Sequence, residues 1–108
     1  LSAYEKLCTD FPQSAWGHNS AAWLCANCRR DLDKGLVHAE KAVKMEPKNA
    51  GHMDTLGEIH FRKGNRDKAI ECMKKCLELD PSNNYFRKQL TRFEKGDIDS
   101  PIPDEEDD

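Results

Sequence analysis

Aromatic residues and long apolar runs are both scarce in this chain of 108 residues. Only 7% of its residues are aromatic and 37% are hydrophobic, whereas 34% are charged. The longest apolar stretch, residues 21–26, is far shorter than the roughly 20 residues that a helix needs to cross a bilayer. No basic segment followed by an apolar one opens the sequence, and no lipidation motif is visible. We therefore expect one small helical domain with much exposed surface and no membrane contact.

The motifs of common catalytic and cofactor sites are also missing. The sequence has neither a glycine-rich phosphate-binding loop nor a His-Glu-x-x-His metal motif. The histidines, His18, His38, His52 and His60, are dispersed, and none lies beside an obvious nucleophile and acid. The sequence therefore predicts a protein that is not an enzyme and that needs no cofactor.

Cysteine occurs in an odd number, at positions 8, 25, 28, 72 and 76, with helical rather than loop spacing. A disulfide-framed secreted domain is usually denser in cysteine, so we expect reduced thiols and a cytoplasmic location. Cys25 and Cys28 have the Cys-x-x-Cys spacing of redox and zinc sites. A redox dithiol normally lies at a helix start, whereas this pair falls at a predicted helix end. A zinc site needs four ligands, and Cys72 and Cys76 belong to a helix that should not face Cys25. We therefore predict that these cysteines are packing residues and that they bind no metal.

The net charge of −3 hides an asymmetry along the chain. Residues 1–96 hold all 17 Lys and Arg against 13 acids, so this part carries +4, whereas residues 97–108 carry −7. The acidic segment contains prolines and little to bury, which predicts a tail over residues 97–108 that is disordered or loosely draped on the helices. One hypothesis is that residues 104–108 fold back onto Lys88, Arg92 and Lys95. The simpler alternative is a solubilising terminus.

An internal repeat is the strongest positive signal. Residues 67–81 repeat the pattern of residues 33–47 at a spacing of 34, from an Asp-Lys pair to an acid followed by proline. A fixed period of this length indicates one supersecondary unit that is copied and stacked. Between the stops at Pro12, Pro47 and Pro81 the apolar residues recur every three or four positions, which is helical periodicity.

This pattern predicts about six helices. A capping residue stands two positions after each proline, where it can accept from the free N–H groups of the next helix; these are Ser14, Asn49 and Asn83. The predicted helices span residues 1–10, 15–28, 32–46, 50–63, 66–79 and 83–95. The first full unit is one residue longer than the second, and we place the extra residue in the turn at 29–31.

The repeated positions resemble the tetratricopeptide repeat family. The second unit supplies Met53, Leu56, Gly57, His60, Gly64, Ala69, Met73, Cys76 and Pro81, and the first supplies His18, Ala21, Ala22, Cys25, Gly35, Ala39, Ala42 and Pro47. His60 and Cys76 depart from the family's aromatic and Ala. The small residues Ala22 and Gly57 on the first helices, and Gly35 and Ala69 on the second, should let each helix pair approach closely.

The resemblance implies an all-α, right-handed superhelical stack of antiparallel helix pairs. Its units are a half repeat at 1–12, repeats at 13–47 and 48–81, and a closing helix at 82–96, followed by the tail. Because the sequence starts with Leu, inside a helical pattern, we expect the C-terminal fragment of a longer repeat protein. The truncated repeat would leave Leu1, Tyr4 and Leu7 on an apolar face that can self-associate.

The family's function is protein–protein interaction through the concave face, and we expect a peptide segment or a partner helix to bind there. By resemblance, the groove residues are Trp16, Asn19, Trp23, Asn27, Asp54, Glu58, Phe61, Arg62, Tyr85, Lys88 and Arg92. Two alternatives are a structural terminal cap of a longer array and a nucleic-acid-binding helical repeat. The acids Asp54 and Glu58 in the groove disfavour nucleic acid.

Equivalent positions on adjacent helices predict two ion pairs, Asp54–Lys88 and Glu58–Arg92. We expect solvated surface pairs that contribute under about 1 kcal/mol each. Such pairing would leave Trp23 and Phe61 to receive apolar side chains of a partner. The acids also predict that this groove is not one of the family's clamps for a terminal carboxylate.

Overall fold

Proline stops and polar caps divide the chain into helices. The computed structural model describes residues 14–103, and this part holds five α-helices and no strand. The helices are α2 (Ala15–Cys28), α3 (Leu32–Met45), α4 (Ala50–Arg62), α5 (Arg66–Leu79) and α6 (Asn84–Lys95). All five begin and end within one residue of the predicted bounds, so the helix assignment is confirmed. The helix predicted over residues 1–10 lies outside the described residues.

The three predicted N-caps are confirmed. The side-chain oxygens of Ser14, Asn49 and Asn83 each accept a hydrogen bond from the backbone N–H three residues later, at 3.0–3.1 Å. These bonds satisfy donors that the first turn of a helix leaves without an intrahelical partner. The caps therefore start α2, α4 and α6 at equivalent positions.

The extra residue of the first unit lies in the turn at 29–31, as predicted. After α4, Gly64 adopts a left-handed φ of 86°, and after α2 the residue 35 positions earlier, Arg29, does the same with a φ of 52°. Helices α3 and α5 nevertheless start only 34 positions apart, at Leu32 and Arg66. Asp31 absorbs the additional residue by adopting a second left-handed φ of 52°.

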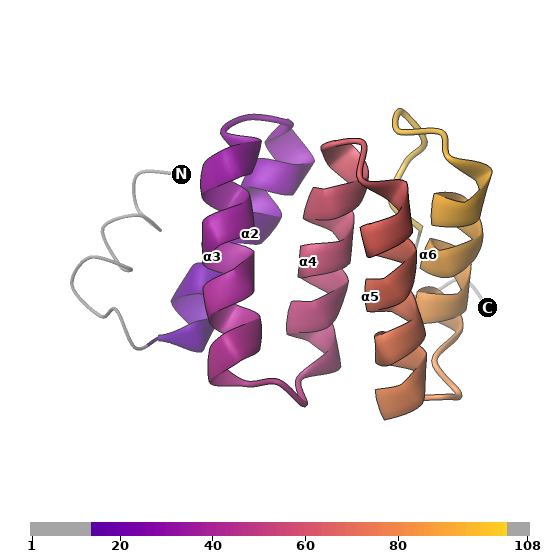
Figure 1. Ribbon diagram of the computed structural model, residues 1–108, viewed down its shortest axis with the longest axis horizontal. Helices are drawn as coiled ribbons and strands as arrows, with labels where there is room; N and C mark the ends of the chain where they lie inside the picture. Colours follow the sequence, from indigo (N-terminus) through magenta and orange to yellow (C-terminus); the bar gives the residue numbers. More distant parts are fainter. Residues whose placement is uncertain (1–13, 104–108) are drawn as a thin grey trace.

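The helices stack in sequence order, as Figure 1 shows from α2 and α3 at one end to α6 at the other. Helix α2 packs on α3, and α4 packs on α5, as antiparallel pairs. The pairs join through contacts of α4 with α2 and α3, and α6 closes the stack against α5. This arrangement confirms the all-helical fold class. Among residues 14–103, no helix is long and apolar enough to span a membrane.

Two buried clusters hold the stack together. The larger lies between α4, α5 and α6 and includes Met53, Phe61, Met73 and Phe93. The smaller lies between α2, α3 and α4 and consists mainly of small side chains around Ile59. Burying apolar surface contributes roughly 25 cal/mol per Å², so the larger cluster should supply more of the stability.

Small residues let the paired helices approach closely. A Cβ added to Gly35 of α3 would lie 2.8 Å from Cys25 Cβ on α2 and 3.0 Å from Ile59 Cδ1 on α4. In the second pair, a Cβ added to Gly57 would lie 3.1 Å from Cys72 Cβ. The predicted need for small side chains at these positions therefore has a direct steric basis.

Replacing Gly35 with Ala should destabilise the protein despite the higher helix propensity of Ala. Overpacking a core costs about 1–3 kcal/mol, whereas the propensity gain is at most about 1 kcal/mol. We expect urea unfolding to show a net loss of about 1–2 kcal/mol. Val37→Ala, on the exposed side of the same helix, is the control and should change the free energy of unfolding by under about 0.5 kcal/mol. A Gly35→Ala protein more stable than the parent would contradict this packing argument.

Candidate functional site

The side chains predicted to line the groove form two groups. One group is buried between α4 and α6 and consists of Asp54, Glu58, Phe61, Arg62, Tyr85 and Arg92. The other group is at least partly open to solvent and consists of Trp16, Asn19, Trp23, Asn27 and Lys88. Arg62 is placed in the first group because its side chain is only 6% exposed within its ion pair.

Glu58 is the centre of a buried ion-pair network. Its two carboxylate oxygens accept from the Nη1 and Nη2 atoms of Arg92, at 2.6 and 3.0 Å, in a bidentate arrangement. Arg62, one turn later on α4, donates from Nε at 2.7 Å. The predicted Glu58–Arg92 pair is therefore confirmed. The expectation that it is solvated is wrong, because the Glu58 side chain is 0% exposed.

Gln89 extends this network to Asp54. Its Nε2 atom donates to Asp54 Oδ1 at 3.1 Å and to Glu58 Oε1 at 3.0 Å, while its Oε1 atom accepts from Arg92 at 2.8 Å. We call Asp54, Glu58, Arg62, Gln89 and Arg92 the polar network. It joins α4 to α6 through side chains that are almost all hydrogen-bonded, which is the condition under which buried charge is tolerated. The Asp54–Lys88 pair stays a prediction.

The network keeps Glu58 ionised. Burial alone would raise its pKa, but the hydrogen bonds from Arg92, Gln89 and Arg62, together with the positive charge of Arg92, hold the pKa of Glu58 below its usual value. The carboxylate is thus a fixed negative charge between α4 and α6, matched by two guanidinium groups. Its role in the structure is to hold Arg62 and Arg92 in place.

Phe61 belongs to the core and does not form part of the groove surface, contrary to the sequence-based expectation. Its ring is 1% exposed and stacks on Phe93 with the ring centroids 4.5 Å apart. The guanidinium carbon of Arg92 lies 4.9 Å from the centroid of Phe61 and covers the ring. A partner side chain therefore meets Arg92 before it meets Phe61. Tyr85 is also buried.

The accessible group offers different chemistry. Trp16 is 63% exposed near the start of α2, and Trp23 is half-buried on the same helix. The Asn27 side chain donates from Nδ2 to the carbonyl of Trp23 at 3.0 Å, which fixes part of its polar surface. Asn19 and Lys88 are half-buried, and the Asn19 Oδ1 and Lys88 Nζ atoms are themselves buried. The exposed surface of this group is therefore mainly aromatic, with the amide of Asn27, and aromatic area is common in protein interfaces.

Residues 97–103, which we call the strap, turn back from the end of α6 onto this side of the molecule. Arg29 and Arg62 both donate to the carbonyl oxygen of Ile98, each at 3.3 Å. Arg92 donates from Nη2 to the carbonyl of Ser100 at 3.0 Å and from Nε to Ser100 Oγ at 2.9 Å. Of the two expectations for the tail, the strap follows the loosely draped one over residues 97–103. The strap is held in place because Arg29 after α2, Arg62 at the end of α4 and Arg92 on α6 donate hydrogen bonds to its backbone carbonyls.

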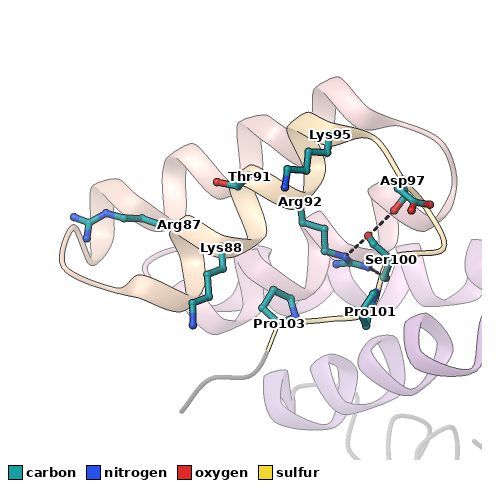
Figure 2. A pocket seen from close by; sticks show the side chains of 9 residues that line it. All are labelled: Arg87, Lys88, Thr91, Arg92, Lys95, Asp97, Ser100, Pro101 and Pro103. Atoms are coloured by element: carbon teal, nitrogen blue, oxygen red, sulfur yellow. Dashed lines mark hydrogen bonds between the residues drawn. The ribbon is translucent and has the colours of Figure 1, made fainter. Parts of the chain in front are cut away.

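A cavity of about 460 Å³ lies between α6 and the strap. Figure 2 shows Arg92 directed at Ser100 across this space, with Pro101 and Pro103 on the opposite wall. Arg87, Lys88 and Lys95 give the α6 wall a positive charge. The predicted fold-back of residues 104–108 lies outside the described residues, although the strap brings the chain to Pro103 beside this wall.

The cysteines differ in burial along the Cys-x-x-Cys pair. Cys25 is buried against α3, whereas Cys28 is exposed at the end of α2. Burial raises the pKa of Cys72 to about 11 and also raises the pKa of Cys76, so both thiols are protonated at neutral pH. Within residues 14–103, no three His, Cys, Asp or Glu side chains gather in a way that could hold a metal ion.

Three functional residues were missed by the sequence analysis. Gln89 was detectable, because it lies three positions before Arg92 and so on the same helix face. Arg29 and Ser100 carried no such signal, since their roles depend on the strap returning to the helices. A charged turn and a short polar tail do not predict that contact.

A family model matches the second repeat. The model described as tetratricopeptide repeat covers residues 53–83, from within α4 to the cap of α6. This is the unit in which the helix turn carries Gly64 and the spacing is 34 residues.

The chain is also similar to parts of much longer proteins. It is 34% identical over 79 residues to mitochondrial import receptor subunit TOM70 of Rattus norvegicus, covering 73% of this chain and 13% of that protein. It is 29% identical over 80 residues to superkiller protein 3 of Schizosaccharomyces pombe, covering 74% and 6%. Small glutamine-rich tetratricopeptide repeat-containing protein 2 of Mycosarcoma maydis is 34% identical over 58 residues, covering 54% and 16%. The chain therefore spans only a small part of each relative.

Proposed function

Because the chain belongs to the tetratricopeptide repeat family, we propose that it is a non-catalytic interaction module whose concave groove binds an extended peptide segment of another protein. The groove is the face formed by α2, α4 and α6. On α2 its partly or fully exposed positions are Trp16, Asn19, Trp23 and Asn27, and on α6 Lys88 lines the cavity.

One observation carries the choice of an extended peptide over a partner helix. The strap already lies on this face with its main-chain carbonyls accepting hydrogen bonds from Arg62 and Arg92. A helix uses its own carbonyls internally, so it has few to offer these donors away from its last turn. An extended segment exposes carbonyls along its length, which suits the two arginines.

A nucleic-acid ligand fits this face less well. Phosphate recognition needs a groove that neutralises negative charge. Here Arg62 and Arg92 are already paired with Glu58, and the strap brings Asp97 and Asp99 to the same side. The charge of this face therefore favours a polypeptide over a polyphosphate.

The proposal is testable by selecting peptides from a displayed random library and measuring their affinity for matched variants. Lys88→Ala should weaken binding by about 3- to 10-fold, and Trp23→Ala by about 30-fold, as expected for an aromatic anchor worth about 2 kcal/mol. Lys74→Ala on the exposed face of α5 removes the same charge outside the groove and should leave the affinity within about twofold.

Circular dichroism must show that each variant retains its helices. If Lys74→Ala weakens binding as much as Lys88→Ala, or if neither groove variant changes the affinity, the groove is not the binding site. If no peptide is selected whose binding requires the folded chain, the proposed function is wrong.

A further inference from the structure

The strap has the features of a bound peptide. Its contacts to the helices are mostly main-chain contacts, to the carbonyls of Ile98 and Ser100, and they come from arginines on α4, on α6 and at the end of α2. Main-chain hydrogen bonds supply affinity with little dependence on sequence. Ile102 adds an apolar anchor, since its half-buried side chain packs against the larger core cluster.

The strap is also preorganised for this position. Ser100 donates from its backbone N–H and from Oγ to the carbonyl of Asp97, at 3.0 and 2.5 Å, which closes a turn directly after Gly96. Pro101 and Pro103 restrict φ on either side of Ile102. Such restriction lowers the conformational entropy that the segment loses on docking.

The remaining contacts of the strap are weak. The Arg29–Asp99 ion pair joins side chains that are 43% and 83% exposed, and exposed pairs contribute little to stability. Ile98 is exposed. The strap therefore lies against Arg29, Arg62 and Arg92 without a large, well-packed interface. A ligand that makes more contacts can replace it.

We propose that the strap is an internal ligand that occupies the groove in cis, and that a partner peptide must displace it to bind. The inference rests on the proposed function and adds the chemistry of the partner. That partner is an extended segment with a hydroxyl residue followed by proline and an aliphatic side chain, as in the strap's own Ser-Pro-Ile-Pro. Its carbonyls take the places of Ile98 and Ser100 opposite Arg62 and Arg92.

The size of the expected inhibition follows from effective concentration. A segment tethered by a short linker reaches an effective concentration of about 1 mM at its site. If the free strap peptide binds with a dissociation constant of about 100 μM, the tethered strap lowers the apparent affinity of a competing peptide about tenfold. If the strap bound the groove much more tightly, a partner peptide could not displace it. If it bound much more weakly, it would not inhibit binding of the partner peptide.

The test uses the full chain and a fluorescein-labelled peptide of the strap sequence, Asp-Ile-Asp-Ser-Pro-Ile-Pro, as the probe. Ile102→Ser removes the apolar anchor of the tethered strap and leaves all five helices unchanged in sequence. We expect fluorescence anisotropy to show that this variant binds the probe about tenfold more tightly than the parent. Val37→Ser, which removes an exposed aliphatic side chain from α3, should bind the probe like the parent.

A second pair of substitutions locates the probe. In the Ile102→Ser background, Arg29→Gln should weaken binding of the probe several-fold, because Arg29 contacts both Ile98 and Asp99. Arg30→Gln, the adjacent exposed arginine, should not. Equal affinity of the parent and the Ile102→Ser variant would overturn the inference, and so would the absence of binding to both. Peptides selected from the library would still bind the groove in either case if the proposed function is correct, so the two failures are distinguishable.

Discussion

Replacing Glu58 with Gln is expected to lower the free energy of unfolding by about 3–5 kcal/mol. The substitution keeps the size of the side chain but removes the negative charge that pairs with Arg62 and Arg92, whose side chains are each only 6% exposed. Breaking a buried pair from one side leaves an uncompensated charge, which is why the cost exceeds that of a surface pair. Denaturant unfolding followed by circular dichroism measures the effect.

The matched control is Glu71→Gln, which removes the same charge from the exposed face of α5. It should change stability by under about 0.5 kcal/mol. If the two substitutions have equal effects, the polar network does not stabilise the α4–α6 contact.

The effect of Glu58→Gln should also depend on pH. Because the pKa of Glu58 is lower in the folded protein than its unfolded value of about 4.3, the carboxylate stabilises the fold above that pH. This contribution is lost as the pH falls through the lower folded pKa. The stability difference between the parent and the Glu58→Gln variant should therefore be full at neutral pH and should shrink below about pH 4.3.

Replacing Phe61 with Ala should cost about 3–5 kcal/mol of stability. The ring is buried between Phe93 and the guanidinium group of Arg92, so its loss removes a stacked pair and opens a cavity under the polar network. The measurement is again the free energy of unfolding. For a domain of this size, such a loss is a large part of the expected total of about 5–15 kcal/mol.

Trp16→Ala is the control for Phe61→Ala, because Trp16 is a large aromatic residue that is mostly exposed. We expect its removal to change stability by under about 0.5 kcal/mol. A Phe61→Ala protein as stable as Trp16→Ala would mean that Phe61 is accessible to a partner after all. In a Trp23→Ala/Phe61→Ala double variant, weaker binding caused by unfolding could not be distinguished from weaker binding caused by a missing contact. Trp23→Ala alone is therefore the variant to use in binding tests.

The fold was predictable because its signals are local and repeated. The prolines and the capping residues Ser14, Asn49 and Asn83 mark each unit, and helical periodicity fills the space between them. The extra residue at 29–31 was also predictable, because the caps are 35 residues apart whereas α3 and α5 start 34 apart. Both spacings can be counted on the sequence.

The site was only partly predictable because burial depends on contacts between units. The Glu58–Arg92 pair follows from the repeat spacing, but its burial does not. Burial arises from Phe61, Phe93 and Gln89 packing around the pair and from the strap contacting Arg92. The composition of the strap correctly predicts low burial, since none of its residues is buried. Its position against the helices is not predictable from composition, because it depends on hydrogen bonds from three arginines of other segments.

The polar network and the strap meet at Arg62 and Arg92, which both pair with Glu58 and both donate to strap carbonyls. Arg92 binds Glu58 on one side and Ser100 on the other, so it joins the stability of the α4–α6 contact to occupancy of the groove. A ligand that replaces the strap inherits a guanidinium group already held in position. Such preorganisation lowers the cost of binding.

The most direct test of groove binding is an NMR titration of the isotope-labelled full chain with a library-selected peptide. The account predicts that amide shifts concentrate at Asn19, Trp23 and Lys88, and that the amides of the strap move toward the positions they have in the Ile102→Ser variant. Shifts confined to the exposed faces of α3 and α5, with the strap unmoved, would contradict it.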